Sequence, residues 1–324
     1  MRKLFFAILL FYVLMAQTTT NPDFSVIGDI QIIQNDSVYF SDSGIELAYQ
    51  GYVNPFAKAS VYFHFHPDEG FELEEAYLAI ERGLPLGLGL RAGVLRPYFG
   101  KINGQHAHIF PFIESPLSVQ STLGPEHWWA NGVEINALLP FPWYSQMALF
   151  YGSDNLKSVA LDGTQLSGAS TMAGCIRWSN FIDLTPVTHL ETGLSYYQEP
   201  GNENALAGAD IKYKYRPNKY HSFTWQSEWF HWLSGHSGQS TAAYSWMNIQ
   251  FNKRWNAGLI LDGVRERGGL IHGGWGVFAG FSPVEESSVV RIKLERPAFP
   301  DDQSSLVTII QLIWSLGPHK PHRF

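Results

Sequence analysis

The feature that most constrains this chain is an alternation of apolar and polar residues that recurs from about residue 24 to the C-terminus. In the segment 61–66 (VYFHFH) the odd positions are apolar and the even positions are polar, and segments 190–194, 209–215 and 290–295 alternate in the same way. Successive side chains of a β-strand point to opposite faces, so each segment has one oily face and one wet face. Many such strands, with aromatics on the oily face and charges on the other, indicate a barrel with lipid outside and water inside.

Sixteen segments can be read as strands of this kind. Each has about ten residues, the length that a tilted strand needs to cross the hydrocarbon of a bilayer. They lie near residues 24–33, 44–53, 58–66, 72–82, 87–97, 131–139, 143–152, 170–179, 187–198, 206–215, 220–232, 240–252, 255–264, 274–282, 286–295 and 304–316. The predicted fold class is therefore all-β, a transmembrane antiparallel β-barrel of about 16 strands, with a range of about 14–18.

The first residues are typical of a bacterial export signal. Arg2 and Lys3 form a basic start, residues 4–15 are apolar but too few to span a bilayer, and Ala16 is a plausible cleavage point. We expect residues 1–16 to be a signal peptide. Since no linker or shift in composition divides the remainder, we expect residues 17–324 to form one barrel domain in the outer membrane.

Composition excludes several other classes of protein. The 22 basic and 29 acidic residues give a net charge of −7, which argues against a nucleic-acid partner. The single cysteine, Cys175, rules out an internal disulfide framework. After the leader, no apolar stretch reaches the roughly 18 residues of a membrane-spanning helix. The 11 Trp, 15 Tyr and 22 Phe suit the aromatic girdles of a barrel at the two membrane interfaces.

The connection after the fifth predicted strand gives the first functional lead. If both termini lie in the periplasm, this strand ends outside near Arg96, and the next begins near Asn131. The segment between them is far longer than typical connections and is rich in apolar residues that favour burial. We predict that residues 98–130 form a constriction loop that folds inward. Its candidate residues are Phe99, Asn103, His106, His108, Phe112 and Glu126.

Local motifs in residues 72–152 and at the C-terminus carry a family resemblance. They are Arg91-Ala92-Gly93, Phe99-Gly100, Asn103, His106, His108, Pro111-Phe112, Leu123-Gly124, Glu126, Gly132-Val133-Glu134, Leu139 to Tyr144, Leu316 to His319, His322 and Phe324. With these motifs the chain resembles a little-characterised family of proteobacterial outer-membrane proteins related to the porin superfamily. The general layout is similar to that of sixteen-stranded porins. Members of the family are sometimes labelled as linked to zinc uptake, and the resemblance carries over no functional residues.

The predicted inner face carries charges of both signs. The candidate pore-lining residues are Lys58, His64, His66, Arg91, Glu191, Asp210, Lys212, Lys214, Glu228, Arg291 and Lys293. Charged rings inside a pore set ion preference. The mixed signs are equally compatible with a solvated wall of cross-strand pairs that has no strong selectivity.

Histidine pairs are the second candidate site. His106 and His108 lie two apart in the predicted loop, and a similar pair occurs at residues 64–66 and another at 319–322. Imidazoles at short spacing beside carboxylates are how proteins bind Zn²⁺. The competing interpretation is that these histidines anchor the loop through backbone and water. We predict no cofactor and keep zinc as the alternative, with His106 and His108 as its candidate ligands.

Signals of catalysis are weak. His127, Ser153 and Cys175 lie in no context typical of a nucleophile and its base. The carboxylates of Glu74 and Glu75 are adjacent and are expected to point apart on a strand. The sequence therefore predicts a protein that is not an enzyme.

Three functions follow from these patterns. The favoured one is a porin-like channel for diffusion of small hydrophilic solutes or ions. The alternatives are an outer-membrane protein that binds or takes up zinc, and a secreted soluble β-protein or enzyme. The expected partners are outer-membrane lipid and lipopolysaccharide, the barrel-assembly machinery during biogenesis, the solutes themselves and, in a homotrimer, copies of the chain.

Overall fold

A computed structural model describes residues 22–41, 44–66, 70–153, 156, 172–200, 204–234, 239–269, 271–284, 287–297 and 306–317. The strands are β1 (Asp23–Gln34), β2 (Val38–Ser41), β3 (Ile45–Asn54), β4 (Ala57–His66), β5 (Gly70–Ile80), β6 (Leu88–Leu95), β7 (Ala130–Leu138), β8 (Tyr144–Ser153), β9 (Met172–Thr185), β10 (Thr188–Gln198), β11 (Ala205–Asn218), β12 (His221–Ser234), β13 (Gln239–Gln250), β14 (Trp255–Glu266), β15 (Ile271–Val284), β16 (Ser288–Arg296) and β17 (Val307–Leu316). The short helical elements are η1 (Pro85–Gly87), η2 (Ala107–Ile109) and α2 (Leu117–Leu123). In the described part of the chain, no helix has the length and apolar composition to cross a membrane.

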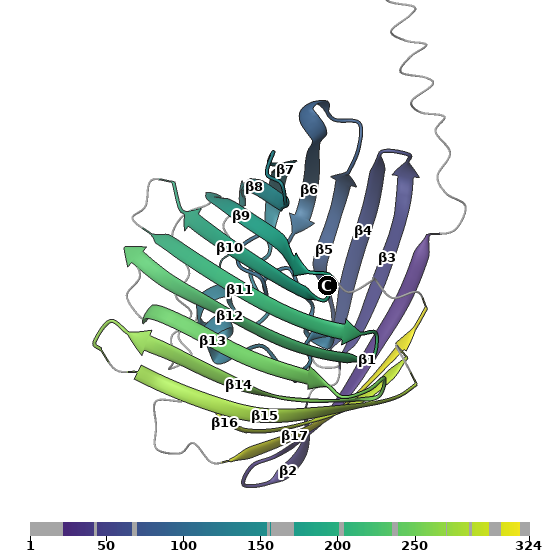
Figure 1. Cartoon of the computed structure of the whole chain (residues 1–324), viewed down its shortest axis with the longest axis vertical. Helices are drawn as coiled ribbons and strands as arrows, with labels where there is room; N and C mark the ends of the chain where they lie inside the picture. Colours follow the sequence, from purple (N-terminus) through teal and green to yellow (C-terminus); the bar gives the residue numbers. More distant parts are fainter. Residues whose placement is uncertain are drawn as a thin grey trace, which may run out of the picture.

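The strands close into a barrel (Figure 1). From β3 to β17 each strand pairs antiparallel with the next, and β17 pairs with β1 from Val26↔Leu316 to Gln34↔Thr308. Closure matters because a closed sheet leaves no edge of unpaired backbone groups. The predicted all-β antiparallel barrel is confirmed.

The seventeenth strand is explained by an interruption rather than by an extra position in the barrel. β2 pairs with residues 31–34 of β1, and β3 pairs with residues 23–28 of the same strand. The two therefore occupy one strand position in succession, and β2 lies at the lower rim of the barrel in Figure 1. Counted in this way the barrel has the sixteen predicted strand positions, and β6 is the fifth of them.

The outer wall is apolar, as the alternation predicts. Leu149, Leu194 and Ile292 are about half exposed on it, whereas the intervening side chains Ser195 and Arg291 are buried on the inside. Large apolar side chains exposed around an entire sheet would be unstable in water. This wall is therefore suited to lipid.

The long connection between β6 and β7 folds into the barrel, as predicted. Its apolar side chains Phe99, Phe112 and Trp128 are completely buried, and α2 packs against β13 and β14 from within. In Figure 1 this connection is the blue chain visible behind β10–β13.

The inner wall differs from the expectation of a uniformly polar face. On β8–β15 many inward side chains are apolar and buried against the loop: Phe150, Cys175, Tyr197, Leu206, Phe230, Trp232, Tyr244, Trp246, Ile260, Val264 and Phe278. The reason is that the loop replaces water as the neighbour of part of this wall, so where the loop packs these strands are apolar on both faces. That explains why apolar and polar residues do not alternate clearly in residues 240–252, the segment that contains β13.

Candidate functional site: the inward loop and its wall contacts

The loop leaves the barrel wall at a buried ion pair. The Nη2 atom of Arg91, on β6, is 2.7 Å from Oε1 of Glu134, on β7. The Nε of Arg91 donates a hydrogen bond of 2.9 Å to the same oxygen. The other oxygen of Glu134 accepts the backbone N–H of Tyr98 at 2.9 Å. The Arg91 guanidinium also lies over the Tyr98 ring, 4.0 Å from its centre. Residue Arg91, predicted to line the pore, therefore serves to direct the chain inward.

A second anchor requires glycine. Gly100 has a φ of +64°, and a Cβ there would lie 2.4 Å from Glu228 Oε2. Its N–H donates to Ser195 Oγ at 3.0 Å, and the N–H of Ile102 donates to Glu228 Oε1 at 2.7 Å. Only glycine lets the loop backbone approach the wall this closely. Predicted pore residue Glu228 thus holds the loop, and it also accepts the Tyr244 hydroxyl at 2.6 Å.

The two ends of the loop are joined by one amide side chain. Asn103 Nδ2 donates to the carbonyls of Pro97, at 2.9 Å, and of Trp128, at 3.1 Å. Its Oδ1 accepts the N–H of Trp128 at 2.8 Å. This buried side chain satisfies backbone groups at both ends of the loop, which is the role that a short polar residue can play in a dry interior.

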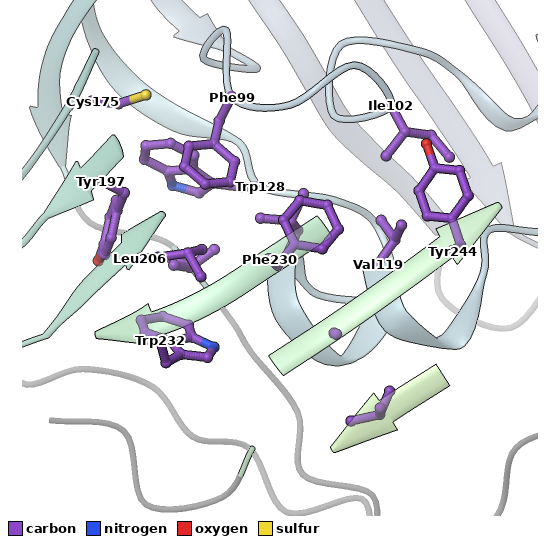
Figure 2. Close-up of a cluster of buried hydrophobic side chains, with 14 of the residues drawn as sticks. Phe99, Ile102, Val119, Trp128, Cys175, Tyr197, Leu206, Phe230, Trp232 and Tyr244 are labelled. Carbon is purple, nitrogen blue, oxygen red and sulfur yellow. The ribbon is translucent and has the colours of Figure 1, made fainter. Parts of the chain in front are cut away.

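One side of the loop is held by aromatic packing (Figure 2). Trp128 meets Phe150 and Tyr197 edge to face, with ring centres 5.6 and 5.2 Å apart. Phe99 stacks on Phe230 at 6.3 Å. These arrangements are the favoured ones for aromatic pairs, and they exclude water from this part of the interior.

The opposite side of the loop contacts a cluster of charged groups. His106 Nδ1 lies 3.3 Å from Glu46 Oε2 of β3 and 3.1 Å from Glu74 Oε2 of β5, and its Nε2 lies 3.3 Å from Glu75 Oε1. His108 Nδ1 is 3.0 Å from the same Glu46 oxygen. The predicted pair of loop histidines is therefore brought together with carboxylates that sequence reasoning had not grouped with it.

A β-bulge makes this cluster, and it corrects an expectation. Tyr62 pairs with Glu75, but Phe63 pairs with Leu73, so Glu74 is an extra residue with no partner on β4. Both Glu74 and Glu75 contact His106 inside the barrel. The prediction that these adjacent carboxylates point apart is wrong, because a bulge breaks the strict alternation of a strand.

Electrostatics hold His106 in its charged form. Burial alone would lower the pKa of His106, but the contacting carboxylates of Glu46 and Glu74 raise this pKa well above its ordinary value. By contrast, burial, with the charges of Arg96 and His106, lowers the pKa of His127 to about 3. At neutral pH His127 is therefore an uncharged partner of Ser115, whose Oγ lies 2.5 Å from its Nε2.

The basic residues of β16 hold the middle of the loop. Arg291 Nη2 donates to the carbonyl of His108 at 2.8 Å, and Lys293 Nζ donates to the carbonyl of Ile113 at 3.2 Å. Lys293 also lies 2.5 Å from Glu295. These two predicted pore-lining residues thus face inward, but their charges are used to fix loop backbone.

The remaining predicted wall residues also face inward. Asp210 pairs with Arg177 of β9 at 2.6 Å, and Glu191 contacts both Lys101 of the loop and Lys212. Lys58 donates a hydrogen bond to Gln50, and His64 lies 3.5 Å from Glu74. Lys214 is half-buried. Loop residue Glu126 is exposed. The His66 side chain, His319 and His322 lie outside the described residues, as does the predicted signal peptide.

Space remains on the side of the loop that faces β14–β17 and β1. A cavity of about 300 Å³ there is lined by polar and charged groups from both the loop and the wall. They include Glu114, Gln120, Asp262, Lys293 and Glu295. The interior therefore keeps a polar space beside its aromatic core.

Comparison with known proteins identifies the class of fold. No family model matches the chain. An uncharacterised protein of Aquifex aeolicus is 23% identical over 306 residues, which cover 79% of this chain, and the chain spans 64% of that relative's length. Neither result assigns the chain to a sequence family.

Solved structures of bacterial porins share the fold. Salmonella typhi OmpF, in complex with daunomycin, superposes with a TM-score of 0.62 at 8% identity, over 93% of this chain and 100% of that one. Pseudomonas putida OprB gives 0.60 at 10% identity, over 94% and 96% of the two chains. A mutant of the Rhodopseudomonas blastica porin gives 0.62 at 10% identity, over 91% and 100%. The chain therefore has the porin fold, reached by a sequence with little in common with these porins.

Proposed function

We propose that the protein is an outer-membrane channel of the porin kind, through which small hydrophilic solutes or ions diffuse. The observation that carries this proposal is a closed barrel, apolar outside, whose long loop is folded inward and anchored to the wall. A loop held in this way narrows the passage through the barrel without blocking it. The porin fold of the neighbours supports the same function.

The cellular setting belongs to the same proposal. We propose that outer-membrane lipid and lipopolysaccharide surround the apolar outer wall. We also propose that residues 1–16 are the export signal and that the barrel-assembly machinery inserts the barrel into the membrane. We also propose the homotrimer as its assembly. The measurement is the mass of the purified barrel in mild detergent, which should be three times that of the chain.

Conductance in a planar bilayer tests the channel directly. The purified protein should insert and produce discrete steps of ion current. Because aromatic packing fills one side of the interior, we expect those steps to be small for a barrel of this size. If repeated insertion of folded protein gives no current, the channel proposal fails, and partition into the aqueous phase would favour a secreted soluble protein instead.

A charge reversal tests whether the inner wall governs selectivity. Lys214 faces inward on β11 and is half-buried, whereas Arg254 is exposed in the turn before β14. Lys214→Glu should shift the reversal potential in a salt gradient toward the value for a cation-selective channel. The control Arg254→Glu should leave the reversal potential nearly unchanged. Equal shifts for the two variants would mean that surface charge, rather than the interior, controls permeation.

A further inference from the structure

We propose that Glu46, Glu74 and His106 form a binding site for one divalent transition-metal cation between the loop and the barrel wall, with His108 at its edge. Neither the fold of the porin neighbours nor diffusion through a channel requires such a site. The proposal also stands independently of conductance, because a barrel that passes no current could still bind the ion.

The spacing of the donor atoms suits a small cation. Zinc bonds of about 2.0–2.2 Å to nitrogen and oxygen place tetrahedral ligand atoms about 3.3–3.5 Å apart. His106 Nδ1 lies 3.3 Å from Glu46 Oε2 and 3.1 Å from Glu74 Oε2. One donor atom from each of the three residues lies within 4.8 Å of the others. The three side chains therefore need only small adjustments to bind one ion.

Hydrogen bonding leaves part of this site unsatisfied. The single N–H at His106 Nδ1 faces two carboxylate oxygens and can point at only one of them. Glu74 Oε2 is buried and accepts no hydrogen bond. A buried carboxylate oxygen without a donor is costly. A cation at the shared position would satisfy both oxygens and the ring nitrogen together.

The surroundings resemble those of a ligating histidine. The other ring nitrogen, Nε2, lies 3.3 Å from Glu75 Oε1. Metal-bound histidines usually donate this second N–H to a carboxylate, which fixes the ring and its tautomer. The bulge at Glu74 thus supplies a ligand from one residue and the orienting carboxylate from the next.

The local charge favours a dication. The carboxylates of Glu46, Glu74 and Glu75 gather around His106, and Arg96 lies 3.6 Å from Glu74 and 3.9 Å from Glu75. An ion that binds His106 displaces its proton, and the three carboxylates and one guanidinium then present a net charge of −2 to the ion. Imidazole with carboxylates suits zinc and its neighbours in the first transition series better than calcium or magnesium.

The site also has access to solvent. Side-chain exposure is 12% for Glu46, 16% for Glu74 and 13% for His108, whereas His106 is 7% exposed. An ion could therefore enter from the His108 side. Once bound, it would link the loop to β3 and β5, opposite the aromatic contacts that hold the other side of the loop.

Calorimetric titration with Zn²⁺ tests the proposal on folded barrel in detergent after removal of metals with chelator. We expect one ion per chain. Glu74→Gln, which keeps the shape of the side chain, and His106→Ala should each weaken binding at least about tenfold. Glu75→Gln should weaken it by about 10–100-fold as the orienting residue. The control His189→Ala changes a partly exposed histidine on β10, a strand that contributes no residue to this cluster, and it should bind as the unmodified protein does.

A second probe separates lost binding from lost folding. Co²⁺ should give visible absorption bands of a low-symmetry nitrogen and oxygen site in the unmodified protein and not in Glu74→Gln. The shift in gel mobility on heating should show that both proteins are folded barrels. The proposal is overturned if the folded, metal-free protein binds no Zn²⁺, or if Glu74→Gln binds it equally well. In either case the cluster is a charged anchor in which His106 stays protonated.

Discussion

The loop is held by two different kinds of chemistry on its two sides. Toward β8–β13, Trp128 and Phe99 pack in a dry aromatic core. Toward β3, β5 and β16, His106, Arg291 and Lys293 make charged and hydrogen-bonded contacts. Aromatic packing depends little on salt or pH, whereas charged contacts depend on both. The aromatic contacts of the loop should therefore persist when salt or pH changes, whereas its charged contacts should weaken.

The largest effect is expected on the aromatic side. Trp128→Ala removes a fully buried ring that touches Phe150 and Tyr197, and it should lower the free energy of unfolding by about 3–5 kcal/mol. Urea unfolding of the barrel measures this change. The control Trp255→Ala, at a half-exposed ring on the outer wall, should cost clearly less. Equal losses would show that the aromatic core does not hold the loop.

The next effect concerns the buried charge at the start of the loop. Glu134→Gln keeps the size of the side chain but leaves Arg91 without its carboxylate, so we expect a loss of about 2 kcal/mol in the same urea experiment. Because this ion pair anchors the start of the loop, its loss should make the loop more mobile. The current traces of the channel should then become noisier. An unchanged stability together with quiet traces would contradict this assignment.

A pH effect of similar size is expected from His127. Its pKa is about 3 in the folded protein, against about 6.5 unfolded, so the unfolded chain binds more protons below pH 6.5. Stability should therefore fall as pH falls, by about 2 kcal/mol between pH 7 and pH 5 from this residue.

The variant for this test is His127→Asn, because the φ of +67° at this position is one that asparagine tolerates. Urea unfolding at the two pH values should show a smaller loss for the variant than for the unmodified protein. Parallel losses would mean that His127 is already protonated in the fold.

The smallest effect is expected for an exposed charge pair beside the turn between β9 and β10. His189 Nδ1 lies 2.5 Å from Asp183 Oδ1, but the two side chains are 27% and 67% exposed. Exposed pairs of this kind contribute little because water screens them. His189→Ala should change the unfolding free energy by less than about 0.5 kcal/mol. A loss comparable to that of Glu134→Gln would remove the distinction between buried and exposed charge on which the comparison rests.

Much of the barrel could be predicted from the sequence alone. The sixteen segments correspond to strand positions, and the inward loop lies between Leu95 and Ala130. Both predictions depend on local signals: alternation over a few residues, and an apolar connection too long for a turn. The interruption between β2 and β3 could not be predicted, because it depends on how both strands pair with β1.

The candidate site was predicted only in part. His106 and His108 stood out by their spacing, but their partners did not. Glu46 lies sixty residues before His106 in the sequence, and a bulge reverses the direction expected for Glu74. The only signal in the sequence is slight: in residues 71–75 (FELEE) two consecutive glutamates interrupt the alternation of apolar and polar residues.

The sequence by itself determined which strand faces point out of the barrel, where each strand lies and which segment turns inward, because these properties follow from the order of neighbouring residues. Only the tertiary structure decided which inner side chains are dry, which charges hold the loop and which carboxylates surround His106. These depend on contacts between residues far apart in the chain, and closure of the barrel is what brings them together.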